Sequence, residues 1–233
     1  MAMHLIGSPA SPFVQRCLIV ARAKGHEIAV EPPPGGSMQS DAFRAISPMG
    51  RIPVLALDDG GHLCESGAIT AYLDEVLDGP PLLPAGALAR GRGREIEAIA
   101  IGELAAGLRP VLVHRVFGMG ENEPVVAAGI AQAERGCVAL GRLIGDTPYA
   151  AGEAVSLADA ALVPFVALAS GLAQVPEVAD MMARHAFLAA YLARACANPA
   201  LARTPAEMKA AFAAIVARRR QEATQGSAAA LSE

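Results

Sequence analysis

The chain contains no tryptophan, and aromatic residues make up only 4% of its 233 positions. Alanine contributes heavily to the 53% of hydrophobic residues, which favours helices packed through small side chains over an aromatic-rich β-sandwich. Positive charge is also scarce, because 19 Lys and Arg stand against 23 Asp and Glu and give a net charge of −4. This balance lacks the basic footprint of a nucleic-acid-binding protein, and the arginines at 218–220 are interpreted as a solvated helix end.

Paired cysteines and long apolar runs are absent as well. The four cysteines, at positions 17, 64, 137 and 196, form no CxxC pair and no cluster with histidine at metal spacing. This favours free thiols in a reducing cytoplasm over a disulfide framework or a zinc site. Apolar runs end well before the roughly 20 residues of a membrane span, and the N-terminal segment lacks the apolar stretch of a signal peptide. We therefore expect a soluble, cytoplasmic protein without a metal, a permanently bound cofactor, or contacts with nucleic acid or membrane.

The first 77 residues alternate between short apolar runs and helical patterns. Strands are predicted at 3–7, 27–31, 53–57 and 62–64, and helices after Ser11 up to Gly25, at 40–46 and at 66–77. The first two strands need a right-handed crossover helix, so the natural solution is a four-stranded mixed sheet. This is the arrangement of a thioredoxin-like domain.

A turn-rich stretch at 78–84, Asp-Gly-Pro-Pro-Leu-Leu-Pro, breaks this pattern. Beyond it no strand is predicted, and helices are expected at 89–117, 124–145, 156–172, 185–197 and 205–220. The expected architecture is a thioredoxin-like α/β domain followed by an all-α helical domain. Its predicted divisions are the first domain at 1–78, a linker at 79–88, the helical domain at 89–220 and a disordered tail at 221–233.

Two motifs at predicted strand ends suggest a ligand pocket. Pro53 follows an aliphatic residue at a strand start, where the backbone can turn outward to hydrogen-bond a ligand. Glu65 and Ser66 open the helix at 66–77, where free backbone N–H groups and the helix dipole favour a bound carboxylate. Together they predict a pocket that grips a peptide-like ligand at two points. The alternatives are an edge-strand proline and an ordinary helix start.

Ser11 lies where the first strand turns into the first helix, with Pro12 at the first helical position. A thiol with a pKa near 8.5 is mostly protonated at pH 7, and a hydroxyl that donates to sulfur at a helix N-terminus favours the thiolate. The alternative is that Ser11 is only an N-cap. Ser8 is a rival hydroxyl three residues earlier, whereas Cys17 is interpreted as a buried core residue.

These motifs resemble those of the cytosolic glutathione transferase family, in its serine-type classes of the tau, zeta or bacterial kind. Many members have Ser-Pro-Phe, two further residues and Arg where the first strand turns into the first helix, and residues 11–16 match this. Ser156 and Asp159 resemble the family's folding signature, a capping box in the helical domain. The motifs run from Ser8 to about Leu168, and the fold-level resemblance covers nearly the whole chain.

The resemblance implies a role for each matching residue. Ser11 stabilises the glutathione thiolate, and Ile52, held by a cis bond to Pro53, pairs with the cysteinyl unit. Glu65 and Ser66 hold the γ-glutamyl end, through the ammonium and the carboxylate respectively.

Two further parts of the site follow less directly from the resemblance. Several members have a basic residue near position 39 for the glycyl carboxylate; this chain has Gln39 there, and Arg51 offers the charge instead. The acceptor pocket is expected between the domains. Its expected lining is Ala10, Phe13 and residues of the long helix near Leu108, Leu112, Arg115 and Val116.

The implied function is that of a glutathione transferase. Its activated thiol attacks a small apolar electrophile, with glutathione as co-substrate, and the chain is expected to form a homodimer through residues 66–77 and 89–117. Three alternatives stay open: a glutathione-dependent isomerase, a dehalogenase, and a non-catalytic glutathione-binding or regulatory protein of the same fold. The sequence does not identify the electrophile, the transferase class or the pathway.

Overall fold

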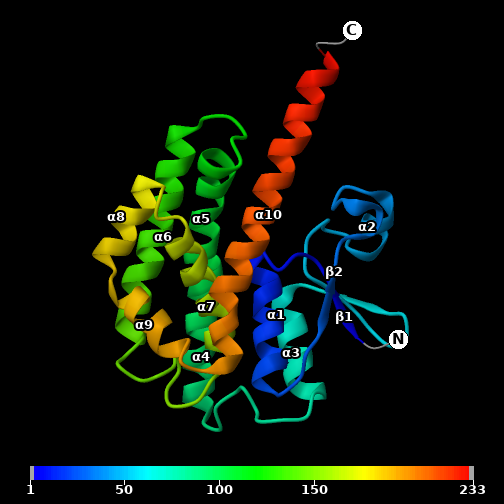
Figure 1. Ribbon diagram of the computed structural model, residues 1–233. Coiled ribbons are helices and arrows are strands. Elements are labelled where there is room, and N and C mark those ends of the chain that lie inside the picture. The colour runs from blue at the N-terminus through cyan, green and yellow to red at the C-terminus, as the bar shows by residue number, and fades with distance from the viewer. Residues whose placement is uncertain (1–2, 231–233) are drawn as a thin grey trace.

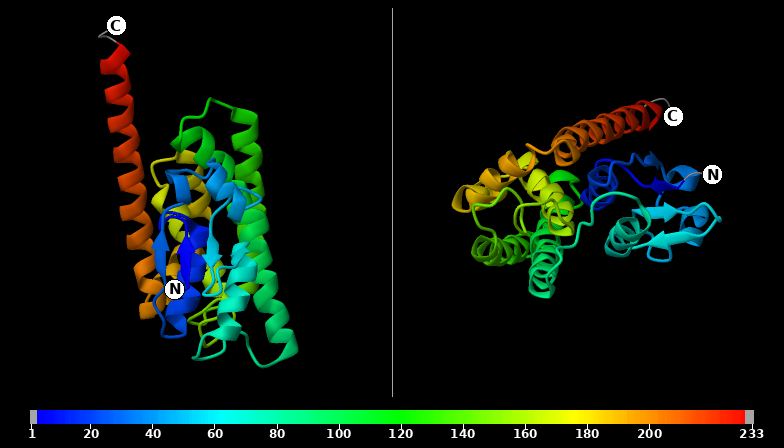
Figure 2. Two further views of the ribbon diagram at one scale, coloured as in Figure 1. Left: turned by 90° about the vertical axis from the view of Figure 1, so that its right-hand side faces the viewer. Right: turned by 90° about the horizontal axis from the view of Figure 1, so that it is seen from below.

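Strands and long helices occupy different stretches of the chain. The computed structural model describes residues 3–230, and the side chains of all of these except 216 and 218–230. The strands precede residue 65, and the chain after residue 86 consists of helices and their connections (Figure 1). Seen from below, the blue and cyan segments lie beside the green to orange helices (Figure 2). These two regions are called the sheet part (3–76) and the helical part (87–230).

One mixed sheet forms the centre of the sheet part. Its strands are β1 (His4–Ile6), β2 (Ala29–Glu31), β3 (Val54–Ala56) and β4 (His62–Cys64). They lie in the order β2-β1-β3-β4, with β1 parallel to β2 and the other pairs antiparallel. The parallel pair needs a crossover, which helix α1 (Pro12–Ala23) supplies. The predicted four-stranded sheet of a thioredoxin-like fold is confirmed.

Alternate residues of each strand face opposite layers, because side chains alternate along a strand. Leu5 belongs to the large core that α1 shares with α3 (Ser66–Val76) and with the helical part. Its neighbour Ile6 packs on the other side with Phe43 of α2 (Asp41–Ile46). The proline-rich loop between β2 and α2 contains a 3₁₀ turn, Pro34–Gly36. The sheet is thus covered by helices on both faces.

The helical part begins with one long continuous helix. Its segments are α4 (Ala87–Ile99), the π-helical η2 (Ala100–Ala105), α5 (Ala106–Val111) and the π-helical η3 (Leu112–Val116). It is followed by α6 (Glu123–Leu143), α7 (Leu157–Gly171), α8 (Pro176–Arg184), α9 (Phe187–Ala195) and α10 (Pro199–Ala230). The predicted helices at 89–117, 124–145, 156–172 and 185–197 agree with these bounds within a few residues.

Helix α8 was not predicted. Its nine residues include three charged ones, Glu177, Asp180 and Arg184, and the sequence shows only a short amphipathic pattern in which Val178 and Met181 are buried. Pro176 occupies the first turn, where a missing N–H costs no helical hydrogen bond. Because a pattern of two buried residues is too short to recognise, the sequence indicated a connection here instead of a helix.

The prediction for the C-terminal helix was wrong at both ends. Instead of spanning 205–220, α10 starts at Pro199 and continues to Ala230, so most of the disordered tail predicted at 221–233 is helical. Pro199 occupies the first position of the helix, where its missing N–H costs no hydrogen bond, whereas Pro205 lies inside the helix. The stretch after 220 is rich in Ala, Gln and Glu, which favour helix. Residues 231–233 lie outside the described residues, and so do the side chains of the arginines at 218–220.

Helix α7 is the centre of the helical part, and it contacts α1, α4, α9 and α10. The predicted capping box at its start is present, with Asp159 accepting from the backbone N–H and hydroxyl of Ser156 at 2.9 and 2.8 Å. The other oxygen of Asp159 accepts from Ala150 N at 2.7 Å and from Tyr191 Oη at 2.8 Å. This buried carboxylate therefore joins α7, α9 and the preceding loop.

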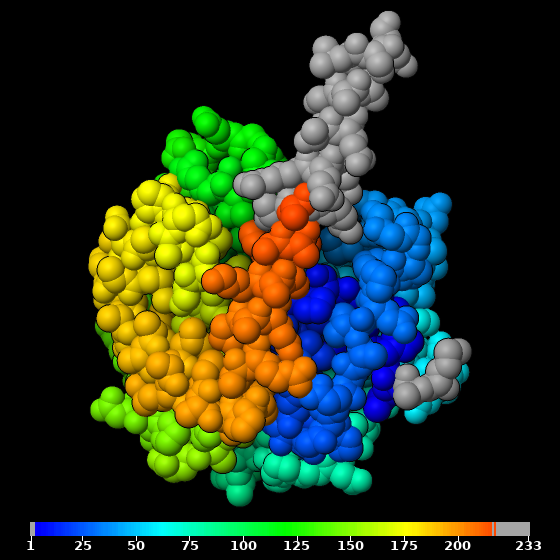
Figure 3. All heavy atoms as spheres, viewed as in Figure 1, coloured from blue at the N-terminus to red at the C-terminus, as the bar shows by residue number. Residues whose placement is uncertain are grey.

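Helix α10 fastens the helical part to the sheet part. Its orange segment runs over the seam between the blue segments and the yellow and orange helices (Figure 3). Glu207 of α10 accepts hydrogen bonds from Arg22 at 2.9 Å and from Gln15 at 3.3 Å, both on α1. Among the described residues, no helix combines the length and apolar character that crossing a membrane requires.

Candidate functional site

Three adjacent strands bring the predicted motifs to one end of the sheet. Ile6 at the end of β1 pairs with Val54 at the start of β3, and Val54 pairs with Cys64 at the end of β4. The residues just after Ile6, just before Val54 and just after Cys64 therefore lie at the same edge, called the sheet end below. They are the β1–α1 loop with Ser11, the Ile52–Pro53 step and the Glu65–Ser66 start of α3.

The β1–α1 loop and the loop before β3 also touch directly. A Cβ atom placed on Gly7 would lie 3.5 Å from Cβ of Ile52 and only 2.7 Å from Cγ2 of Val14. Glycine suits this turn, because a side chain here would clash with Val14 of α1, while position 7 is already in van der Waals reach of Ile52.

Ser11 starts α1 with its carbonyl group instead of its hydroxyl. Its carbonyl oxygen accepts from the N–H groups of Val14 and Gln15 at 3.1 and 3.0 Å. Within the described chain, its side chain makes no capping hydrogen bond, so the helix does not use the hydroxyl. The rival Ser8 is engaged in the turn, since its Oγ accepts from Ala10 N at 3.3 Å and its carbonyl accepts from Ser11 N at 2.9 Å.

The Ile52–Pro53 peptide bond is cis. Pro53 is buried and Ile52 is half-buried. The paired residues of β3 begin only at Val54, so the backbone of Ile52 lies ahead of the strand ladder. The amide and carbonyl of Ile52 are thus placed at the rim of the sheet end.

Glu65 adopts an unusual backbone conformation. With φ 66° and ψ 115°, it is the one non-glycine residue with positive φ among those described. Such a conformation costs on the order of 1–3 kcal/mol and persists where the surroundings enforce it. The carboxylate of Glu65 is exposed, and its carbonyl accepts from Ile69 N at 2.9 Å in the first turn of α3. Backbone strain of this kind gathers at functional positions.

Ser66 is connected to two charged residues that sequence reasoning had not assigned to the site. Its buried Oγ accepts a hydrogen bond from Nη1 of Arg16 at 3.0 Å, and Nη2 of Arg16 donates to Oε1 of Glu97 at 2.5 Å. Because its oxygen already accepts from Arg16, the hydroxyl of Ser66 can donate its own proton outward, to a ligand carboxylate. The buried guanidinium adds positive charge below this helix start. An arginine on an otherwise apolar helix face was the signal for this arrangement.

Gln39 and Arg51 lie on neighbouring loops and are both exposed. A Cβ on Gly50 would be 3.6 Å from the carbonyl oxygen of Met38, so the two loops lie against each other. Gln39 accepts a hydrogen bond from Arg44, which sequence reasoning did not single out. Positive charge is therefore available beside Gln39 as well as on Arg51.

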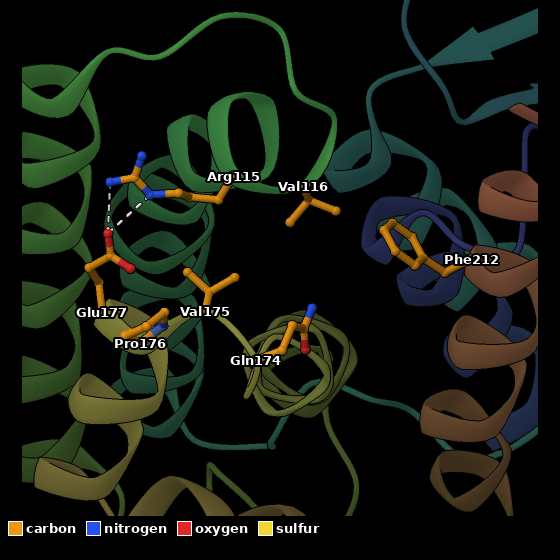
Figure 4. A pocket seen from close by; sticks show the side chains of 7 residues that line it. All are labelled: Arg115, Val116, Gln174, Val175, Pro176, Glu177 and Phe212. Atoms are coloured by element: carbon orange, nitrogen blue, oxygen red, sulfur yellow. Dashed lines mark hydrogen bonds and ion pairs between the residues drawn. The ribbon is translucent and has the colours of Figure 1, made fainter. Parts of the chain in front are cut away.

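A groove of about 700 Å³ opens between η3, the segment before α8, and α10 (Figure 4). Of the predicted acceptor residues, Arg115 and Val116 line this groove, whereas Ala10, Phe13, Leu108 and Leu112 are not among its lining residues. Phe13 instead packs edge-on against Phe165 of α7, at 5.1 Å between ring centroids. The residues that line the groove are Arg115, Val116, Gln174, Val175, Pro176, Glu177 and Phe212.

Helix α10 lines a second hollow, which borders the loop that carries Ser11. Pro9 of that loop and Ala211 of α10 line this hollow of about 370 Å³, and the next residue, Phe212, lines the Arg115 groove. The side chains of Phe117 and Phe212 also approach each other, with centroids 6.1 Å apart. One helix therefore contributes to both the hollow and the groove, and the residues that line the groove all belong to the helical part.

Cys17 lies in the core, as the sequence predicts, and burial raises the pKa of its thiol to about 12. Such a thiol is a poor nucleophile at neutral pH, because the thiolate is the reactive form. Among the described residues, no group of three or more His, Cys, Asp or Glu side chains gathers as metal ligands would.

Two family models match separate stretches of the chain. The model described as "Glutathione S-transferase, N-terminal domain" matches residues 5–81, and "Glutathione S-transferase, C-terminal domain" matches residues 123–194. The first stretch includes the sheet end, and the second runs from the start of α6 almost to the end of α9.

Individual proteins with similar sequence or structure are also known. A maleylacetoacetate isomerase of Pseudomonas aeruginosa is 33% identical over 175 residues, 71% of this chain and 82% of that protein. A glutathione S-transferase of Pseudomonas putida is 30% identical over 173 residues, 73% of this chain and 77% of that protein. A glutathione S-transferase structure from Methylobacterium radiotolerans, in complex with glutathione sulfonate, gives a TM-score of 0.73 at 25% identity and covers 88% of this chain and 94% of its own.

Proposed function

The chain belongs to the glutathione S-transferase family, and we propose that it activates the thiol of glutathione for attack on a small apolar electrophile. One observation carries this proposal: the register of β1, β3 and β4 gathers Ser11, Ile52 and Ser66 at one end of the sheet. A small thiol peptide needs three kinds of group, and the sheet end offers each of them. They are the hydroxyl of Ser11, which its helix does not use, the backbone of Ile52 ahead of the strand ladder, and the helix start at Ser66 above the buried guanidinium of Arg16.

In this proposal the tripeptide is held at both ends and in the middle. Ser66 and its backbone N–H bind the γ-glutamyl carboxylate, and Glu65 binds the ammonium group. The backbone of Ile52, placed by Pro53, pairs with the cysteinyl unit. At the other end, Gln39 and Arg51, with Arg44 beside them, bind the glycyl carboxylate.

Ser11 acts on the thiol itself. Its Oγ donates a hydrogen bond to the sulfur at the start of α1, and this favours the thiolate over the thiol. The thiolate then attacks an electrophile in the Arg115 groove, forming the carbon–sulfur bond as the leaving group departs with its electron pair. Holding both reactants in adjacent sites supplies much of the acceleration.

A glutathione-dependent isomerisation is the second candidate. It is favoured by the 33% identity with the maleylacetoacetate isomerase of Pseudomonas aeruginosa. In that case the thiolate would add to the substrate and leave again, so glutathione would be regenerated. The sheet-end residues would keep the same roles.

We further propose a cytoplasmic homodimer formed through α3 and the long helix from α4 to η3. Four free cysteines suit a reducing compartment. Several residues on these helices are exposed, among them Ala68, Val76 and Leu88. We also propose a division of the chain into domains at 1–78 and 89–220, joined by a linker at 79–88.

Titration calorimetry with glutathione, followed by turnover of 1-chloro-2,4-dinitrobenzene, tests the proposal. We expect glutathione to bind and chloride release to depend on both enzyme and glutathione. Binding without turnover of this or any other electrophile would favour the non-catalytic alternative, and no binding would overturn the proposed function.

A further inference from the structure

Arg115 in the groove is held by two carboxylates. Its Nε and Nη2 donate to Oε1 of Glu177 at 3.0 and 2.8 Å, and Nη2 also donates to Oε2 of Glu123 at 2.7 Å. Figure 4 shows both nitrogens of this edge turned toward Glu177. The edge formed by Nε and Nη2 is one that a guanidinium uses for bidentate binding of a carboxylate, and in Arg115 Glu177 already occupies it.

The three groups are charged together at neutral pH. Hydrogen bonds to Glu123 and Glu177 raise the pKa of Arg115. The pKa of Glu177 is lowered by its own backbone N–H at the start of α8 and by Arg115, and Arg115 also lowers the pKa of Glu123. In the groove wall the charge of Glu177 thus balances that of Arg115, and Glu123, which binds Arg115 from outside the lining, adds one further negative charge nearby.

The other walls carry no charge. Val116, Val175, Pro176 and Phe212 are apolar, and Gln174 offers a neutral amide. Among the described side chains that line the groove, Arg115 is the one cation. A carboxylate brought into the groove would therefore find its counterion occupied and would lie beside Glu177.

We propose that Glu177 is a specificity-determining residue, which reserves the groove for uncharged acceptors by neutralising Arg115 and repelling acceptors that carry a carboxylate. This inference rests on the proposed function, because it names the class of acceptor for the same site. An uncharged aromatic electrophile packs on Phe212 and the two valines, whereas an anionic one loses its hydration without gaining a free cation. It also separates this chain from an isomerase of maleylacetoacetate, which bears two carboxylates.

Two matched acceptors test the inference: 4-chloro-3,5-dinitrobenzamide, which is uncharged, and 4-chloro-3,5-dinitrobenzoate, which is anionic. With each, the thiolate attacks the carbon that bears chlorine, the carbon–sulfur bond forms and chloride leaves. The measured quantity is the ratio of kcat/KM for benzoate to that for benzamide, each divided by the uncatalysed rate with glutathione. We expect the wild-type protein to disfavour the benzoate by tenfold or more.

Glu177→Gln should raise this ratio by about tenfold, because Arg115 then keeps Glu123 as its one ionised partner and its positive charge is no longer balanced inside the groove. The control is Glu134→Gln, which also removes one negative charge; Glu134 binds Arg184 and does not line the groove. We expect the control to keep both the wild-type ratio and the wild-type activity. A wild-type ratio near one, or the same ratio in both variants, would overturn the inference.

A second variant and a binding measurement keep the test decisive. Should Glu177→Gln fail to fold, Glu123→Gln releases Nη2 of Arg115 and should raise the ratio in the same direction, by a smaller factor. Calorimetry with unreactive 3,5-dinitrobenzamide and 3,5-dinitrobenzoate measures the groove without glutathione. Selective amide binding by a protein that fails to bind glutathione would reject the proposed function alone, and equal binding of the two probes would reject the role of Glu177 alone. If Arg115→Gln selectively abolishes benzoate turnover, Arg115 binds anions in the wild type and the inference is wrong.

Discussion

The sheet end and the Arg115 groove hold their polar groups in different ways. At the sheet end, the geometry of short local segments places each group: a helix start, a loop before a strand, or a residue with positive φ. In the groove, Arg115, Glu177 and Phe212 come from distant segments and meet only through the packing of η3, α8 and α10. The first region is suited to one fixed ligand, and the second can change its lining without disturbing the fold.

Replacement of Arg16, which lies below the sheet end, is expected to have the largest effect on stability. We expect Arg16→Ala to lower the free energy of unfolding by about 3 kcal/mol, because it removes a buried ion pair with Glu97 and leaves a cavity. Chemical denaturation measures the change. The control is Arg92→Ala, which removes an exposed pair with Glu95 and should cost less than about 0.5 kcal/mol. Equal losses in both variants would show that Arg16 does not stabilise the sheet end.

Ser11 gives the largest expected effect on catalysis. We expect Ser11→Ala to lower turnover by about a hundredfold while glutathione affinity stays nearly unchanged, because the tripeptide is held mainly elsewhere. Absorbance of the bound thiolate should appear about one pH unit higher in the variant. Ser8→Ala is the matched control and should keep most of the activity. If Ser8→Ala loses turnover and Ser11→Ala does not, Ser8 is the activating hydroxyl.

Ser66 tests whether the helix start of α3 binds a carboxylate. We expect Ser66→Ala to weaken glutathione binding by about tenfold or more, because a charge-assisted hydrogen bond is lost. The control is Ser156→Ala, which removes a serine from another helix start, in the capping box of α7. It should lower stability and leave the affinity unchanged, as measured by calorimetry. Equal affinity of wild type and Ser66→Ala would remove Ser66 from the site.

The features that could be predicted from the sequence are those set by local segments, and the features that could not are set by contacts between distant segments. The four strands and the places of Ser11, Ile52 and Ser66 beside strand ends follow from local patterns, because residues next to a strand end stay next to it in the fold. The ion pair of Arg16 with Glu97 could not be predicted, since its partners are 81 positions apart and Glu97 belongs to no local motif.

The lining of the Arg115 groove shows more clearly what could not be predicted from the sequence. Of the expected lining residues, Arg115 and Val116 line the groove and the others do not, because the orientation of the long helix and the presence of α8 decide which side chains face it. Phe13 was expected there from its position beside Ser11, yet it packs against Phe165 of α7. A groove lined by three helices depends on tertiary packing, which no single segment encodes.

Glu65 separates strain from binding at the sheet end. We expect Glu65→Gly to raise the free energy of unfolding by about 1 kcal/mol, because glycine adopts φ 66° without steric cost. Glutathione affinity should fall at the same time, because the carboxylate for the ammonium group is lost. Glu75→Gly, in the last turn of the same helix, should instead lower the free energy of unfolding, by at most about 1 kcal/mol. Destabilisation by both substitutions would show that Glu65 is not strained.

Glu207 tests the contact that joins the two regions, since α10 carries both Glu207 and Phe212 of the groove. Burial acts to raise its pKa, but hydrogen bonds from Arg22 and Gln15 and the charge of Arg203 outweigh this, so the pKa is lowered. A carboxylate with a lowered folded-state pKa contributes stability that is fully present above its unfolded pKa and is lost as the pH falls through the folded value. We therefore expect Glu207→Gln to be about 1 kcal/mol less stable than the wild type at neutral pH.

This difference should shrink as the pH falls below the ordinary glutamate pKa of about 4.3, because the wild-type carboxylate then loses its charge as well. Denaturation curves at several pH values measure it, with exposed Glu95→Gln as the control that should show little change at any pH. A difference that does not depend on pH would show that Glu207 holds α10 on α1 by packing and neutral hydrogen bonds. In that case the placement of Phe212 beside the Ser11 loop would not respond to acid, and the groove would keep its shape wherever the sheet part stays folded.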